Sequence, residues 1–278
     1  MMDQESVNSI NGCIYKFGPI KNLERTLKEI TLGFSPLESF NDAYESEFGI
    51  AHFFHSLEDE KKLLSPVKTP LDKIQRLSQK YLDTIKVTCF SRIPTNNLMW
   101  AHYANNHKGV CYAFDFSKQQ PPFQEKNIAW GGVIYSSYVP ELKIYQDQTT
   151  EGMLPSLLSD VILTKSQEWS YEEEIRFYHS KDTVSEQYRV ESLKAVILGR
   201  RVNSNDRVDI KKWVDEYNKE NKTNVKILYA HRIARTYTLG INSNEGFQKN
   251  SETSFSAKIP VLSGIISEPL TTITDDDD

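Results

Sequence analysis

Short apolar segments with β-strand character alternate with amphipathic helical segments along most of the chain, and this alternation is the feature that most constrains the fold. The segments with strand character are residues 13–17, 85–90, 110–116, 133–135, 174–178, 195–198 and 225–229. Between them, apolar residues recur with helical spacing near residues 23–30, 71–82, 97–104, 154–162 and 210–217. The pattern predicts an α+β fold with a central mixed or antiparallel sheet flanked by helices.

The same alternation continues to about residue 241 without an internal repeat. We therefore expect a single α+β domain over residues 1–241. From residue 242 the composition shifts to Ser, Asn, Thr and Glu, and the chain ends in four aspartates. Segments of this kind bury too little apolar surface to fold alone, so we expect residues 242–278 to form a polar, acidic and mobile tail.

Composition excludes several classes of protein. The 278 residues carry a net charge of −5, which lacks the uniform positive field of non-specific DNA-binding proteins. The three cysteines, Cys13, Cys89 and Cys111, form no CxxC pair, and no metal-ligand motif accompanies them, so we expect no metal. The polar N-terminus and the lack of a run of about 18 apolar residues argue against a signal peptide and a membrane span. We therefore expect a cytoplasmic protein without membrane contact.

Aromatic and histidine side chains gather in residues 99–111. If residues 97–107 were one helix, Trp100, Tyr103 and His107 would share a face that can stack a planar ligand. The alternative is that Trp100 and Tyr103 pack in the core while His107 caps the end of the helix.

Acidic and aromatic residues gather again in residues 169–178. On a strand beginning at Glu174, the side chains of Glu174, Arg176 and Tyr178 share one face. A carboxylate at the start of a buried strand is a good catalytic position. The alternative is a Glu174–Arg176 ion pair on a solvated strand face. The P-loop, GxGxxG, HExxH and GxSxG motifs are absent.

Several blocks in a fixed order carry a family resemblance. They are residues 14–17, 34–36 with 40–42, 89–91, 99–103 with 107–111, 169–176 and 196–199. Together, over residues 14–199, they resemble the bacterial family catalogued as domain of unknown function 2971. Ala43 departs from this family, which commonly has a proline after Asn-Asp.

The order of strand positions also resembles, more distantly, the ADP-ribosyltransferases. These enzymes place an Arg or His on a first strand, a Ser, Thr or Tyr at the end of a middle strand and a Glu at the start of a later strand, all converging on NAD. Tyr15 and Lys16, Ser91, and Glu174 fall at these positions, although Tyr15 and Lys16 replace the Arg or His.

This resemblance implies NAD as the substrate and an ADP-ribosyltransferase-like arrangement of the fold. Glu174 would stabilise the oxocarbenium ion, Ser91 would position Glu174 or the ribose, and Glu172 is the other candidate for the catalytic carboxylate. The residues then expected around NAD are Tyr15, Lys16, Asn41, Trp100, His102, Tyr103, His107 and Arg176.

Such a transferase would be an effector, a toxin or a phage-defence protein, that modifies nucleic acid or protein and is held silent by a neutralising partner. Two other classes stay open. A metal-independent nuclease would use His102 and His107 for acid–base chemistry at a phosphodiester, with Arg176 steadying the phosphate. A non-enzymatic sensor would bind a nucleotide or a partner in the aromatic pocket.

Overall fold

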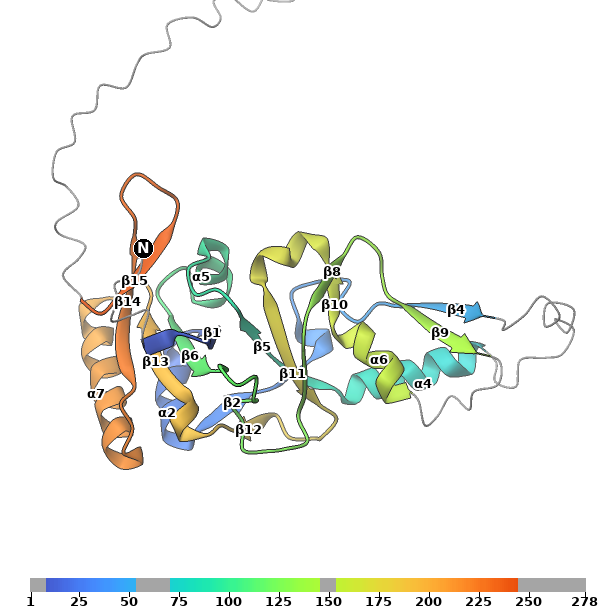
Figure 1. The fold of residues 1–278 in the computed structure, drawn as a ribbon, viewed down its shortest axis with the longest axis horizontal. Helices are drawn as coiled ribbons and strands as arrows, with labels where there is room; N and C mark the ends of the chain where they lie inside the picture. Colours follow the sequence, from blue (N-terminus) through green and yellow to red (C-terminus); the bar gives the residue numbers. More distant parts are fainter. Residues whose placement is uncertain (1–8, 54–70, 146–153, 245–278) are drawn as a thin grey trace, which may run out of the picture.

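The computed structural model describes residues 9–53, 71–145 and 154–244 (Figure 1). Within these residues, nine strands form one mixed sheet in which eight follow the order β15-β14-β13-β6-β1-β5-β11-β7, and β3 also pairs with β5. All neighbours in the sheet are antiparallel except β13 and β14, which are parallel. The predicted α+β fold with a mixed central sheet is therefore confirmed.

The strands of this sheet are short. They are β1 (Cys13–Gly18), β3 (Ser35–Pro36), β5 (Lys86–Ser91), β6 (Val110–Asp115), β7 (Ala129–Gly132), β11 (Glu174–His179), β13 (Leu193–Leu198), β14 (Lys226–Arg232) and β15 (Leu239–Asn242). Among the described residues, three smaller sheets pair β2 (Thr31–Gly33) with β12 (Ser185–Gln187), β4 (Gly49–Phe53) with β9 (Glu141–Tyr145), and β8 (Ile134–Ser136) with β10 (Thr164–Ser166).

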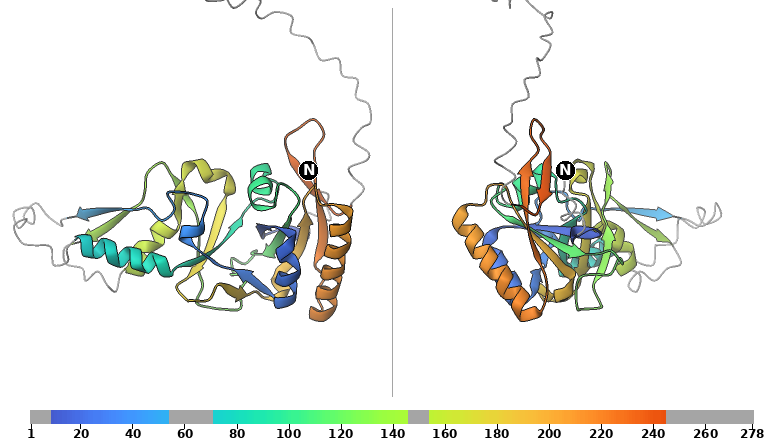
Figure 2. Two further views of the ribbon diagram at one scale, coloured as in Figure 1. Left: turned by 180° about the vertical axis from the view of Figure 1, so that it is seen from behind. Right: turned by 60° about the vertical axis from the view of Figure 1, so that its left-hand side comes forward.

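Two helices, α2 (Leu23–Glu29) and α7 (Ser204–Asn221), cover one face of the sheet and lie side by side in Figures 1 and 2. Leu23 and Leu27 of α2 and Ile210 and Val214 of α7 belong to the largest apolar cluster. The sheet contributes alternate strand residues to it, among them Ile14, Phe90, Phe114, Phe177 and Val196. Period-2 alternation along the strands thus directs one set of side chains to this core.

The opposite face carries two separate apolar clusters. One lies under α5 (Asn97–Tyr103), where Trp100 packs with Tyr15 and Cys111. The other lies under α4 (Leu71–Thr84) and α6 (Leu154–Ile162) and contains Leu82 and Leu158. Polar side chains gather in the middle of this face, between the two clusters.

Most of the predicted strands and helices are present, but two local predictions are wrong. The helix after Asn96 ends at Tyr103, and Asn105, Asn106 and His107 follow with positive φ. The predicted single face of Trp100, Tyr103 and His107 therefore does not form. The turn-forming and aromatic residues of segment 33–42 predict an ordered loop without regular secondary structure, but the segment contains β3 and a 3₁₀ helix at Leu37–Ser39.

Several strands were not predicted, including β4, β7, β9 and β15. The last of these ends at Asn242, where the sequence predicts the tail to begin. Residues 245–278 lie outside the described residues, and so does Thr69, which the sequence Thr69-Pro70 predicts as the cap at the start of a helix. Among the helices that are described, none combines the length and the apolar character needed to cross a membrane.

Candidate functional site

A pocket opens in the polar middle of the sheet, along one edge of β5. β1 pairs with β5 at Tyr15 and Ser91, near the end of β5, and β3 pairs with Val87 and Lys86 at its beginning. Between these two contacts β1 and β3 leave a gap. Lys16 of β1 reaches across it, and its Nζ donates to Thr88 Oγ1 at 2.7 Å and to the Cys89 carbonyl at 3.3 Å.

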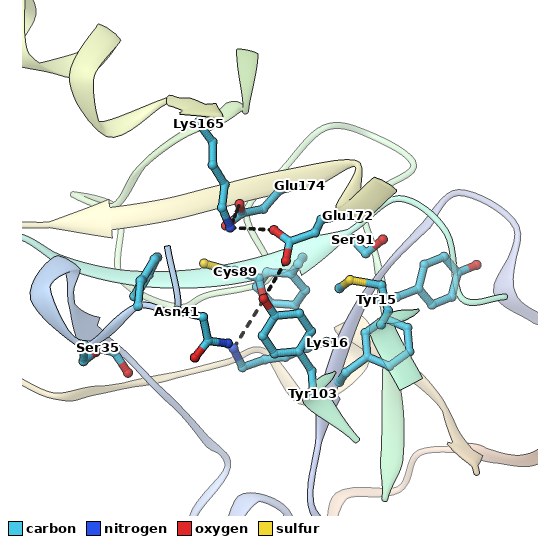
Figure 3. Close-up of a pocket in the computed structure, with 15 residues that line it drawn as sticks. Tyr15, Lys16, Ser35, Asn41, Cys89, Ser91, Tyr103, Lys165, Glu172 and Glu174 are labelled. Atoms are coloured by element: carbon cyan, nitrogen blue, oxygen red, sulfur yellow. Dashed lines mark hydrogen bonds and ion pairs between the residues drawn. The ribbon is translucent and has the colours of Figure 1, made fainter. Parts of the chain in front are cut away.

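We call this cavity the acidic pocket, because two glutamates line it (Figure 3). Its volume is about 200 Å³. Residues that the sequence analysis placed at the site supply much of its lining: Tyr15, Lys16, Asn41, Ser91, Tyr103, Glu172 and Glu174. Residues from β1, β5, β11, α5 and the segment after β3 thus meet at one point although they are far apart in the sequence.

Three of these residues form a row across adjacent strands. Tyr15 of β1 lies opposite Ser91 of β5, and Ser91 lies opposite Glu174 of β11. Directly opposed residues in antiparallel strands point to the same face, so the row runs across the floor of the acidic pocket. These are three of the positions that the ADP-ribosyltransferase resemblance singled out.

Arg176 binds the carboxylate of Glu174 from outside the pocket. The two residues lie two apart on β11, and Arg176 Nε donates to Glu174 Oε1 at 3.0 Å. The guanidinium also donates to both oxygens of Glu45, at 2.6 and 2.9 Å, and to the Ile162 carbonyl at 2.6 Å. Arg176 is 0% exposed, so the alternative of an ion pair on a solvated face is wrong. Arg176 supports the floor and does not line the pocket.

Lys165 joins the two glutamates. This lysine lies on β10, and its Nζ is 2.6 Å from Glu172 Oε2 and 3.6 Å from Glu174 Oε2 (Figure 3). Its side chain is 5% exposed, and those of Glu172 and Glu174 are 2% and 4% exposed. Buried charges require partners of opposite sign, so Lys165 is the cation that allows both carboxylates to face one small cavity.

Arg176 and Lys165 together determine the ionisation of Glu174. Burial alone would raise the pKa of this carboxyl, but the nearby Arg176 and Lys165 outweigh burial, and the pKa lies below its ordinary value. Burial likewise tends to lower the pKa of Lys165, but Glu174 and Glu172 raise it above the ordinary value. Glu174 is therefore an anion, and Lys165 a cation, at neutral pH.

Tyr103 forms the wall above Glu172. Its hydroxyl donates to Glu172 Oε1 at 2.5 Å and accepts a hydrogen bond from the Asn41 side chain (Figure 3). Burial and Glu172 both raise the pKa of the Tyr103 phenol, so the phenol keeps its proton. A chain of hydrogen bonds and ion pairs thus runs from Asn41 through Tyr103, Glu172 and Lys165 to Glu174.

Three other predicted residues do not line the acidic pocket. Trp100 is 0% exposed, and its indole N–H donates to the Pro94 carbonyl at 2.7 Å, so its ring belongs to the core. His107 stacks on Trp100 and lies on the left-handed segment after α5. His102 is exposed and lines a neighbouring cavity instead. Tyr103 is therefore the ring of this helix that a pocket ligand can contact.

Two further pocket residues, Ser91 and Lys16, also have hydrogen-bond partners within the protein. The Ser91 hydroxyl donates to the Ile93 carbonyl and accepts from the Ile93 N–H, at 3.2 and 3.1 Å. This is the local turn that serine at a strand end commonly forms. Lys16, whose pKa burial lowers, is tied to β5 as described above.

Sequence reasoning missed Lys165, Glu45 and the lining position of Cys89. Lys165 lies in the short segment Thr164–Ser166, which has no helical or strand periodicity of its own. Glu45 is 131 residues from its partner Arg176. A buried arginine needs carboxylate partners, so knowledge that Arg176 is buried would have predicted a second partner such as Glu45 beside Glu174. The sequence does not show that Arg176 is buried.

Comparison with known proteins identifies one family. A family model described as Protein of unknown function (DUF2971) matches residues 99–177. No curated protein and no solved structure matches the chain. The matched residues run from α5 through β11 and include Tyr103, Lys165, Glu172 and Glu174. Residues 99–177 of the chain are therefore similar to the family of proteins of unknown function called DUF2971, which supports the resemblance indicated by the sequence motifs.

Proposed function

We propose that this protein is an ADP-ribosyltransferase that uses NAD as its substrate, with Glu174 as the catalytic carboxylate. The observation that carries the proposal is the row of Tyr15, Ser91 and Glu174 across β1, β5 and β11, at the floor of a pocket. The ionised state of Glu174 gives this row the charge that the reaction requires.

The proposed chemistry breaks the bond between C1′ of the ribose and the nicotinamide nitrogen. The bonding electron pair leaves with nicotinamide, and positive charge develops on C1′ and the ring oxygen. A fixed carboxylate stabilises this charge without needing to reorganise. An acceptor nucleophile then forms the new bond to C1′ and loses its proton, for which Glu172 is the nearest further carboxylate base.

Each wall residue has a part in this proposal. Tyr103, with its ring at the pocket and its hydroxyl on Glu172, stacks against the nicotinamide and positions Glu172. Lys165 keeps the two carboxylates together, and Arg176 fixes the orientation of Glu174. Ser91 positions Glu174 through the pairing of β5 with β11, because its hydroxyl is hydrogen-bonded to the backbone of Ile93.

The test is release of nicotinamide from NAD by wild type and by Glu174→Gln, with Glu173→Gln as the matched control. Glu173 is the exposed neighbour, so its variant makes the same chemical change outside the pocket. Loss of the Glu174 charge should lower turnover by about 10²-fold or more. Each variant should be assayed at a temperature below its melting transition. Glu174 is a buried ion-pair partner, so its replacement also lowers stability.

Glu172→Gln extends this test. A larger loss in Glu172→Gln than in Glu174→Gln would move the catalytic carboxylate to Glu172. Full turnover in both variants, or no turnover by wild type with any acceptor, would contradict the transferase proposal.

In its biological setting, the proposed enzyme is an effector, either a toxin or a phage-defence protein, that modifies nucleic acid or protein and is restrained by a neutralising partner. Expression of wild type without that partner should then slow bacterial growth, whereas Glu174→Gln at the same protein level should not. Equal growth of the two strains would count against an effector role.

A nucleotide-binding sensor without catalysis is the second candidate. One observation favours it: Glu172 and Glu174 both already have cationic or hydrogen-bonding partners. A sensor would bind NAD and leave it intact, so the same nicotinamide assay separates the two functions. The nuclease alternative has less support, because Arg176 is fully buried with its donors occupied and His102 lines a different cavity from Glu174.

A further inference from the structure

A second cavity of about 650 Å³ adjoins the acidic pocket and shares Tyr103 as a wall. Its other charged or titratable lining residues are Lys21, His102, Lys108, Arg201 and Asp206. They come from the turn after β1, from α5 and the segment following it, and from the start of α7. We call this cavity the basic pocket.

The charge of the basic pocket is positive, and its cations form no ion pair with another described residue. Lys21, Lys108 and Arg201 are all exposed. Among the ion pairs between described residues, none involves any of these three cations. The one carboxylate in the pocket, Asp206, accepts a hydrogen bond from the Asn203 side chain at 2.8 Å. Three cations against one anion favour a ligand that carries more than one negative charge.

The backbone fixes two of these cations close together. His107 O accepts a hydrogen bond from the backbone N–H of Arg201 at 3.0 Å, and Lys108 is the next residue after His107. Burial lowers the pKa of His107, and the positive charges of Arg200 and Arg201 lower it further. The crossing of these two segments therefore holds Lys108 and Arg201 at one side of the cavity before any ligand binds.

The size of the acidic pocket gives a reason for the second cavity. Sites for ligands of ordinary drug size measure about 300–1,000 Å³. The acidic pocket, at about 200 Å³, holds one end of a dinucleotide but not the whole molecule. The rest of the dinucleotide must then extend out of the acidic pocket past Tyr103. The basic pocket, which also has Tyr103 as a wall, carries the positive charge that binds phosphate groups.

We infer that the basic pocket binds the diphosphate of a nucleotide, with Lys21, Lys108 and Arg201 contacting the phosphate oxygens. This inference rests on the proposed function in one respect: the diphosphate is assigned to the NAD molecule whose nicotinamide ribose occupies the acidic pocket. Binding of a diphosphate by itself needs no catalysis, so the two proposals can fail separately.

The experiment is titration calorimetry with ADP, ADP-ribose and adenosine as probes. Wild type should bind ADP and ADP-ribose, and adenosine, which lacks phosphate, should bind at least about tenfold more weakly. Lys108→Ala and Arg201→Ala should each weaken ADP binding by about tenfold, since each removes one charged partner of the phosphates. Asp206→Asn should strengthen ADP binding, because it removes the repelling charge.

Lys219→Ala is the matched control. Lys219 is an exposed lysine in the last turn of α7, and its separation of 16 sequence positions from Asn203 places it about 24 Å along the helix axis from the pocket. Its removal makes the same change in net charge and should leave ADP affinity unchanged. An equal loss of affinity in Lys219→Ala and Lys108→Ala would show that net charge, and not the pocket, attracts the ligand, and would overturn the inference.

Other outcomes are equally decisive. If ADP binds and depends on Lys108 and Arg201 while NAD is never cleaved, the basic pocket stands and the transferase proposal fails. If NAD is cleaved and neither its KM nor ADP affinity changes in these variants, the transferase stands and the basic pocket falls. If a short single-stranded oligonucleotide binds through Lys108 and Arg201 but ADP does not, the surface is a nucleic-acid site and the diphosphate inference is wrong.

Discussion

The residue with the largest consequence for the charge of the site is Lys165, which lies between two buried carboxylates. Replacing Lys165 with Met keeps most of the apolar stem and removes the cation, which leaves Glu172 without its ion-pair partner and Glu174 with only its ion pair to Arg176. Removal of one partner from a buried ion pair costs about 3–5 kcal/mol, because the other charge stays buried without compensation. We expect a loss of this size in the free energy of unfolding, measured with urea.

Lys181→Met is the control for Lys165→Met. Lys181 contacts Glu125 at 2.6 Å, the same distance as Lys165 to Glu172, but the side chains of Lys181 and Glu125 are 40% and 29% exposed. Exposed pairs contribute about 1 kcal/mol or less. Equal and small losses in both variants would mean that Lys165 does not balance the buried charge.

Glu174 makes the stability depend on pH. Its folded-state pKa lies below the ordinary value of 4.5 because Arg176 and Lys165 outweigh burial. A carboxyl of this kind contributes stability that is complete above the ordinary pKa and is lost as the pH falls through the folded-state pKa. The free energy of unfolding of wild type should therefore fall in acid more steeply than that of Glu174→Gln, which has no proton to bind at this position.

Urea unfolding of wild type and Glu174→Gln between about pH 7 and pH 3 measures this effect. The difference in free energy of unfolding between the two proteins should narrow as the pH falls. A difference that stays constant over the whole range would show that Glu174 binds a proton equally well in the folded and unfolded states.

At the scale of elements, two glycines allow two backbone segments to cross next to Lys108 and Arg201 of the basic pocket. Gly199 donates to the Gly109 carbonyl at 3.0 Å, and Gly109 donates to the Ala104 carbonyl at 2.7 Å. A Cβ added at Gly199 would lie 2.3 Å from the His107 carbonyl oxygen, closer than any real Cβ contact. Gly199→Ala should therefore push the segment that carries His107 and Lys108 out of place.

We expect Gly199→Ala to lower the free energy of unfolding by about 1–3 kcal/mol, as overpacking commonly does. It should also weaken ADP binding, since Lys108 moves with the segment. Gly33→Ala is the control, because a Cβ there has its nearest atom, the Val184 carbonyl oxygen, at 4.0 Å. If Gly199→Ala were as stable as Gly33→Ala, the crossing would be looser than its geometry indicates.

Secondary structure was predicted well where local periodicity determines it and poorly where contacts between distant segments determine it. Strands such as β5 and β11 and the helix α7 follow from local periodicity, and so does the shared face of Glu174 and Arg176. The sequence predicts a helix over residues 97–104, close to the observed end of α5 at Tyr103, but it does not predict the left-handed residues 105–107, whose backbone lies close to Gly199. β7, with the sequence AWGG, is a strand through its pairing with β11, and its two glycines give no strand signal.

The site shows the same division. The resemblance to ADP-ribosyltransferases implies that Tyr15, Ser91 and Glu174 lie close together, and the three residues pair across adjacent strands. Lys165 and Glu45 come from segments with no local signal and reach the site only through tertiary packing. The charge balance of a buried site depends on such long-range partners, so it could not be predicted from the pattern around Glu174.

At the scale of the whole molecule, the continuous sheet connects cores that lie on opposite faces. Ile210 of α7 belongs to the cluster under α2 and α7, and Leu158 of α6 belongs to the cluster under α4 and α6. β5 contributes Phe90 to the first cluster and Val87 to the second. Residues 119–122, with the sequence Gln-Gln-Pro-Pro, are the segment that the sequence suggests as most open to proteolytic cleavage. In the structure this segment leads directly to buried Phe123, and Arg189 N donates to the Pro122 carbonyl at 2.8 Å. We therefore expect the two faces to unfold together.

Leu158→Ala and Ile210→Ala test this cooperativity. Both side chains are 0% exposed, and removal of such a side chain costs about 2–5 kcal/mol. Each variant should lower one common melting transition, seen equally by tryptophan fluorescence and by far-ultraviolet circular dichroism, since coincident probes are the mark of a single cooperative unit. Limited proteolysis should trim residues beyond about 242 and leave the remainder intact. Two separate transitions, one shifted by each substitution, or an early cut near residue 120 that releases two stable halves, would show instead that the sheet joins two independent units.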